Sequence, residues 1–132
     1  MNVLKKIILP VLLATIWISI SEFIRNEFLL KQYWTDHYSG LGLIFPSKPI
    51  NGAVWGIWSL VFAVVIFIIS RKFSFWQTVG INWIAGFVLM WLVVGNMAVL
   101  PFGILPVAIP LSAVEVIVAT FIFFKLSAPK AS

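Results

Sequence analysis

The chain has 132 residues, of which 62% are hydrophobic and only 10% are charged. This length allows one compact domain, and a soluble domain of this size would need more charge to cover its surface. The absence of cysteine excludes disulfides, thiolate metal sites and cysteine nucleophiles. The net charge of +5 comes from Lys and Arg residues that flank apolar segments, a pattern typical of membrane orientation and not of nucleic-acid binding.

Four apolar segments follow one another along the chain, at residues 7–28, 50–70, 75–99 and 105–125. Each has about 20 residues or more, enough for a helix to cross a hydrocarbon core about 30 Å thick. The alternating pattern of a membrane β-barrel does not occur. We therefore predict an all-α integral membrane protein, an antiparallel bundle of four transmembrane helices. A single domain would span residues 1–126, and residues 127–132 would form a short disordered tail.

The first segment carries polar residues along one face. Thr15, Ser19, Glu22 and Asn26 recur at steps of four, three and four, and Arg25 lies three residues after Glu22. An alternative for this part of the chain is a signal peptide, with residues 19–21 (Ser-Ile-Ser) as a small-x-small cleavage site.

Residues 31–49 are predicted to form an extracytoplasmic loop between the first two helices. Its aromatic residues would place it in the belt at the headgroup level of a membrane. A sharper interpretation is a cap that folds over the outer ends of the helices. The cap residues would be Trp34, Asp36, His37 and Tyr38.

The remaining three helices also have one face of small or polar residues each. Small residues allow membrane helices to approach closely, and polar side chains bond between them, so we expect these faces to form the bundle interior. The face of the second helix consists of Asn51, Gly52, Trp55, Gly56, Ser59 and Ala63. The face of the third consists of Asn82, Gly86, Leu89, Val93 and Asn96, and that of the fourth consists of Ala108, Ser112, Glu115 and Ala119. Ser74 and Gln77 predict a capping box at the start of the third helix. Pro110 is expected to kink the fourth helix or to end a short first piece of it.

The distribution of Lys and Arg predicts the orientation of the bundle. With a cytoplasmic N-terminus, six basic residues lie inside and three lie outside, which favours N-in and C-in. The inner set is Lys5, Lys6, Arg71, Lys72, Lys125 and Lys130, and the outer set is Arg25, Lys31 and Lys48. The short loops and the absence of any Asn-x-Ser/Thr site favour a multi-pass protein of a bacterial inner membrane.

Glu115 is the residue that most needs a physical explanation. It lies in an apolar run with no Lys, Arg or His nearby on the same segment. A charged residue in the middle of a bilayer costs at least about 2.5 kcal/mol, so it must be neutral, paired or hydrated. Three roles are open: a protonated structural clasp bonded to Ser112, Ser59 or a backbone carbonyl, a group that binds protons or cations, and a lining of a ligand cavity. Arg25 is the nearest possible counter-ion.

These features predict a small transporter or ligand-binding membrane protein with an outward-facing polar cavity, coupled to protonation of Glu115. Glu22 and Arg25 would form its gate or counter-ion pair. The cavity would be lined by Ser19, Asn26, Asn51, Ser59, Asn96 and Ser112. Besides the lipid bilayer, we expect a homo-oligomer or another membrane protein as partner, and no nucleic acid.

The alternative function is a non-enzymatic structural or accessory subunit of a membrane complex. Its interface would be the side of the bundle with Trp58, Trp83 and Trp91. An enzyme is the least supported class, because the chain has no Ser-His-Asp order, no phosphate-binding glycine loop and no paired intramembrane acids. With a single His in the chain, we expect no metal site, and no cofactor is expected.

Overall fold

The computed structural model describes residues 3–127, which are helical apart from short connections and contain no strand. Four helices in this range are long and apolar enough to cross a membrane. They are Leu4–Leu29, Pro49–Ser70, Phe75–Asn96 and Phe102–Leu126. The prediction of an all-helical chain with four such helices is therefore confirmed. Of the predicted tail, residues 128–132 lie outside the described residues, whereas Ser127 is buried.

The first long helix consists of three parts. A π-helical turn, η1 (Leu4–Ile8), leads into α1 (Leu9–Phe23), and a second π-helical turn, η2 (Ile24–Leu29), follows it. Leu30 is buried and ends the helix, because its backbone leaves the helical region. Ten residues of the segment that we expected to be a loop then form a separate helix, α2 (Lys31–Gly40).

The second long helix is α3 (Pro49–Ser70), and the third again contains a π-helical turn. The third consists of α4 (Phe75–Trp83), η3 (Ile84–Val88) and α5 (Leu89–Asn96). Its predicted capping box is confirmed. The Ser74 hydroxyl accepts the Gln77 backbone N–H, and the Ser74 backbone N–H donates to the Gln77 side chain.

The fourth long helix begins with a short 3₁₀ turn, η4 (Phe102–Ile104), and continues as α6 (Leu105–Leu126). Pro110 lies inside α6, which remains one continuous helix. The expectation that a short first piece ends at this proline is therefore wrong. Pro110 is the sixth residue of α6, so its ring removes one hydrogen bond, to the carbonyl four residues earlier, without ending the helix.

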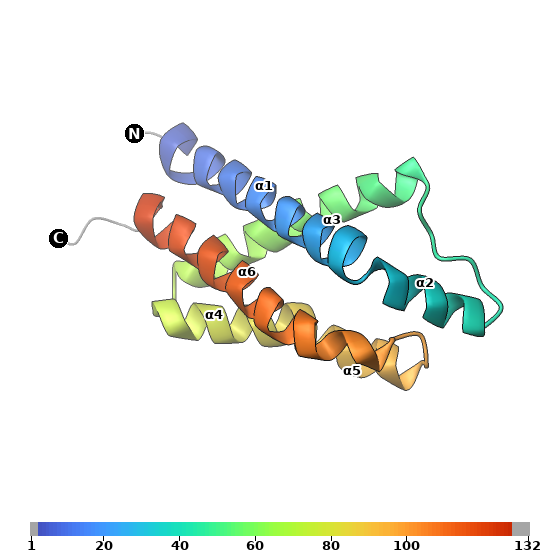
Figure 1. Ribbon diagram of the computed structural model, residues 1–132. Coiled ribbons are helices and arrows are strands. Elements are labelled where there is room, and N and C mark those ends of the chain that lie inside the picture. Colours follow the sequence, from blue (N-terminus) through green and yellow to red (C-terminus); the bar gives the residue numbers. More distant parts are fainter. Residues whose placement is uncertain (1–2, 128–132) are drawn as a thin grey trace.

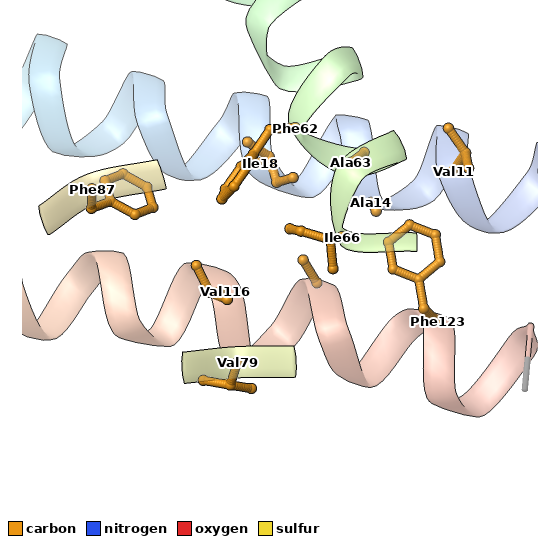
Figure 2. Close-up of a cluster of buried hydrophobic side chains, with 11 residues drawn as sticks. Val11, Ala14, Ile18, Phe62, Ala63, Ile66, Val79, Phe87, Val116 and Phe123 are labelled. Atoms are coloured by element: carbon orange, nitrogen blue, oxygen red, sulfur yellow. The ribbon is translucent and has the colours of Figure 1, made fainter. Parts of the chain in front are cut away.

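The helices run back and forth between two ends of the molecule (Figure 1). The described termini and the α3–α4 connection lie at one end, and α2 lies at the other, near the turn that follows α5. α1 and α6 lie side by side. All four long helices contribute apolar side chains to one central cluster, among them Ile18, Phe62, Phe87 and Val116 (Figure 2).

The small and polar faces are not all interior. The face of α6 is buried, but the first half of α3 is exposed, with Trp55 46% and Ile57 62% accessible. Burial on α3 begins only at Ser59. The prediction is therefore wrong for Gly52, Trp55 and Gly56, and also for Leu89, Val93 and Asn96 on α5. The first half of α3 leans away from the other long helices, so it has no neighbour to pack against (Figure 1).

Candidate functional site

Three charged side chains meet between α1, η2 and α6. Arg25 donates from Nη2 to Oε2 of Glu22 at 2.6 Å and from Nη1 to Oε1 of Glu115 at 3.1 Å. The exposed fractions are 6% for Glu22, 5% for Arg25 and 0% for Glu115. We call these three residues the ion cluster. It holds two carboxyl groups and one guanidinium, so its formal charge is −1 when all three groups are ionised.

Helix geometry explains why Glu22 and Arg25 point to the same partner. Residues three apart lie on one face of a helix, and this face of α1 is turned toward α6. Arg25 also lies in the π-helical turn η2, where its carbonyl accepts the N–H of Leu30, five residues later. Turns of this kind are rare and frequently occur at functional sites.

Two aromatic residues hold the ion cluster from other sides. The guanidinium carbon of Arg25 lies 5.2 Å from the ring centre of Phe87, a fully buried residue of η3. A cation above a ring face is attracted by the negative charge of the π system. The indole N–H of Trp17 on α1 donates to the backbone carbonyl of Glu115 at 2.8 Å, which fixes the two helices in register at the cluster. Neither Trp17 nor Phe87 is among the site residues that the sequence predicts.

Asn26 connects the ion cluster to α2. Its amide donates to Oε1 of Glu22 at 3.2 Å, and its carbonyl oxygen accepts the indole N–H of Trp34 at 3.2 Å. Trp34 also packs against Tyr38 and Phe45, with ring centres 6.4 and 5.8 Å away. One end of α2 is thereby attached to the cluster through polar contacts.

The other predicted cap residues differ in their contacts. A ring nitrogen of His37, Nε2, lies 2.8 Å from the carbonyl oxygen of Ala98, in the turn after α5. Asp36 is exposed and accepts a hydrogen bond from Gln32 of its own helix at 2.6 Å. Trp34 and His37 therefore contact other parts of the bundle, Tyr38 packs against Trp34 and Phe45, and Asp36 faces outward.

The remaining residues predicted to line a cavity do not gather around one. Ser59 is buried and donates to the carbonyl of Trp55 in its own helix. Asn51 accepts the backbone N–H of Lys48 at the start of α3, Asn96 is exposed, and Ser19 is partly buried. Of the six predicted cavity residues, only Asn26 contacts the ion cluster.

Ser112 has a different role from the one we expected. Its hydroxyl donates to the carbonyl of Ile109 and accepts the indole N–H of Trp83 at 2.9 Å. It therefore joins α6 to α4 and does not bond to Glu115. Trp83, Trp58 and Trp91 are partly buried against the central apolar cluster, so only part of each side chain is accessible on the side of the bundle that we expected to form an interface.

The structure also corrects the expectation that no paired acids occur within the apolar helices. Glu22 and Glu115 lie 93 positions apart in the sequence, yet both bind the same guanidinium. This pairing could have been predicted from the small number of charged residues, because the four long helices hold few of them away from their ends.

Two cavities lie on the surface of the bundle. One of about 160 Å³ lies between α1, η2 and α6, and Trp17, Ser21, Arg25 and Val114 are among its lining residues. The other, of about 480 Å³, lies between α3 and the third long helix. Neither is lined by any of the six residues predicted for the outward polar cavity.

Four buried polar atoms of the described residues have no hydrogen-bond partner. They are Oε2 of Glu115, Oδ1 of Asn82, Oγ1 of Thr120 and Oγ of Ser127. Only the first belongs to an ionisable group. The ion cluster therefore contains a free acceptor at its most buried point, where it can hold a proton or receive a donor.

Comparisons of the chain with models of known protein families, with curated proteins and with solved structures find no match. The function must therefore be inferred from the chemistry of the ion cluster and its surroundings.

Proposed function

We propose that this chain is a small multi-pass membrane protein whose ion cluster takes up and releases a proton during transport or ligand binding. Glu115 is the proton-exchanging group, and Glu22 and Arg25 hold it in place. The observation that carries the proposal is the composition of the cluster: two buried carboxyl groups share one buried guanidinium.

The formal charge of the cluster supports proton exchange. A buried charge without a counter-ion is unfavourable. Removing one partner of a buried ion pair, for example, costs about 3–5 kcal/mol. One proton added to either carboxyl group makes the cluster neutral. The free Oε2 of Glu115 offers a position for the proton.

Charge distribution supports the proposed orientation. The turn η1, the α3–α4 connection and the last turn of α6 lie at the end of the molecule that contains the described termini (Figure 1). These segments carry the basic residues Lys5, Lys6, Arg71, Lys72 and Lys125. Arg71 donates there to the carbonyl of Ser127 at 2.8 Å. Basic residues are enriched on the cytoplasmic side of membrane proteins, so we place both termini in the cytoplasm, as in a bacterial inner membrane.

Infrared spectroscopy of the carboxyl groups in lipid tests the proposal. We expect a protonated carboxyl band that responds to the external pH in the wild-type protein and disappears or shifts in Glu115→Gln. The Gln side chain retains an acceptor for Arg25, so this variant should fold. Glu27→Gln is the matched control, because Glu27 is 35% exposed and pairs with Lys31 at the surface.

A band that is insensitive to pH, or failure of Glu115→Gln to accumulate, would contradict proton exchange. Glu115 would then act as a structural clasp, and the accessory-subunit function would be preferred. One observation favours that function as a second candidate. Gly52 and Gly56 are one helical turn apart on the exposed half of α3, and a Cβ added at either would meet no atom of another element within 4 Å. Small residues at this spacing allow a partner helix to approach closely.

A further inference from the structure

The larger cavity, of about 480 Å³, lies in the groove between α3 and the third long helix. These two helices are joined by the connection that contains Arg71 and Lys72, and they diverge from it (Figure 1). None of the described lining residues is charged, and the one amide among them, Asn82, is 0% exposed. Roughly 150 Å³ is enough for one benzene ring, so this largely apolar cavity has room for a much longer hydrocarbon group.

The cavity is open on a side of the bundle that would face lipid. Val61, Val65 and Leu89 belong to its lining and are 55%, 38% and 54% exposed. Along α3, the lining runs from Val65 to Trp58, which lie six and thirteen positions before Arg71. With a rise of about 1.5 Å per residue, these positions are about 9 and 20 Å from Arg71 along the helix axis. One leaflet of a bilayer is about 15 Å thick in its apolar part, so the cavity lies at the depth of the acyl chains of the leaflet next to Arg71.

The connection from which this groove starts is basic. Arg71 and Lys72 are both exposed, and Arg71 uses one N–H group to donate to the carbonyl of Ser127 at 2.8 Å. An arginine has several such donors in a planar fork, which fits the oxygens of a phosphate group. All four acidic side chains of the chain contact side chains of η2 or α2, so none of them neutralises this connection. An apolar groove that starts at an uncompensated positive charge fits an anionic amphiphile.

We propose that this groove binds one anionic phospholipid of the adjoining leaflet. Its phosphate group accepts hydrogen bonds from Arg71 and Lys72, and one of its acyl chains occupies the cavity. Basic groups between membrane helices attract anionic lipid headgroups in this way. The inference rests on the proposed membrane location but not on proton exchange, because the groove shares no residue with the ion cluster.

Native mass spectrometry of the full chain, released from detergent micelles, tests this site. The probe is phosphatidylglycerol. The matched control is phosphatidylcholine with the same acyl chains, whose headgroup carries a compensating positive charge. We expect one phosphatidylglycerol molecule per chain, bound at least about tenfold more tightly than phosphatidylcholine. Inorganic phosphate at millimolar concentration should not displace it, because phosphate lacks the acyl chain that fills the cavity.

Variants of the basic connection test the headgroup contact. Arg71→Gln/Lys72→Gln should bind the two lipids equally, because no positive charge remains at the start of the groove. Lys72→Gln alone leaves the bond from Arg71 to Ser127 intact and should lose part of the lipid preference, so the test does not depend on the folding of the double variant. Lys31→Gln/Lys48→Gln removes the same charge at the opposite end of the molecule and should keep the wild-type preference (Figure 1).

A variant of the lining tests the acyl-chain contact. Ala85 of η3 lines the cavity and is exposed, so Ala85→Phe can be accommodated while its ring takes the space of the acyl chain. This variant should lose the retained phosphatidylglycerol. Ala53→Phe is the matched control, because Ala53 is exposed on the first half of α3 and is not part of the lining, and it should retain the lipid.

Equal affinity for the two lipids, full displacement by inorganic phosphate, an unchanged lipid preference in both variants of the connection, or normal retention by Ala85→Phe would each overturn the inference. None of these results changes the carboxyl band of Glu115, whose response to pH tests the proposed function separately.

Discussion

The α1–α6 contact and the first half of α3 are both built from apolar helix with a few small or polar residues, yet they have opposite surroundings. At the contact, Glu115 is completely buried, and it is bound by Arg25 of η2 and by Trp17 of α1. On α3, Ile50 and Ile57 are 65% and 62% exposed. The difference shows that hydrophobicity and small residues alone do not decide which helix faces pack. The α1–α6 contact is distinguished by polar bonds between helices, whereas the exposed half of α3 has small residues, Gly52 and Gly56, without such bonds.

The largest effect should come from removing the guanidinium of the ion cluster. Arg25→Leu leaves two buried carboxyl groups without a counter-ion, and we expect a loss of about 3–5 kcal/mol in the free energy of unfolding. The measurement is denaturation by a harsh detergent from mixed micelles. Lys31→Leu is the matched control, because Lys31 pairs with Glu27 at the surface at 3.2 Å, with side chains 50% and 35% exposed.

We expect Lys31→Leu to change stability by only about 0.3–0.5 kcal/mol, as for other exposed helical pairs. Similar losses in the two variants would show that the ion cluster does not hold α1 and α6 together. Arg25→Lys should be more stable than Arg25→Leu, because lysine keeps the positive charge. It should be less stable than the wild type, because an ammonium group lacks the planar fork with which the guanidinium bonds to both carboxyl groups.

A smaller effect should distinguish two glycines, one packed in the interior of the bundle and one on the exposed half of α3. A Cβ added at Gly86 would lie 2.7 Å from the Phe62 ring, whereas a Cβ at Gly56 meets nothing within 4 Å. Gly86→Ala should therefore destabilise the bundle by about 1–3 kcal/mol, because buried Phe62 must move. Gly56→Ala should stabilise α3 by up to about 1 kcal/mol in the same unfolding assay.

A destabilising Gly56→Ala would contradict the view that the first half of α3 is unpartnered. It would indicate that a second chain packs closely there, as the accessory-subunit function requires. The oligomeric state of the same variant, measured by sedimentation in detergent, would identify whether that second chain is a copy of this one.

The smallest effect should come from two buried serines. Ser112→Ala removes the acceptor of the Trp83 indole N–H and with it a hydrogen bond between two helices. The free energy of unfolding should fall by about 0.6 kcal/mol, and by at most about 1.7 kcal/mol. Ser59→Ala removes only a bond to the carbonyl of Trp55 within the same helix, so the unfolding free energy should hardly change. Equal losses at both positions would show that the Trp83 bond adds nothing to stability.

Several features of the fold were predictable from local sequence. The bounds of the long helices follow from hydrophobicity, and the capping box at Ser74 follows from residue types three positions apart. The helix α2 was missed, because an aromatic and polar segment of ten residues has no apolar periodicity of its own. Its position depends on contacts made by Trp34 and His37 with other parts of the chain.

The candidate site was only partly predictable. Glu115, Glu22 and Arg25 were each identified, because charged residues in apolar helices are costly and therefore conspicuous. The expected partners Ser59 and Ser112 were wrong, since both hydroxyls bond elsewhere. Periodicity shows which residues share a face of one helix, but it contains no information about the rotation of one helix relative to another.

The sequence alone determined that the chain is helical, that four helices are long and apolar enough to cross a membrane, and which few residues are charged within them. These properties are local, because each helix satisfies its own backbone hydrogen bonds. Only the tertiary structure decided that Arg25 joins Glu22 to Glu115 and that the first half of α3 remains exposed. Both outcomes depend on the rotation and tilt of whole helices, which are determined by contacts between residues far apart in the chain.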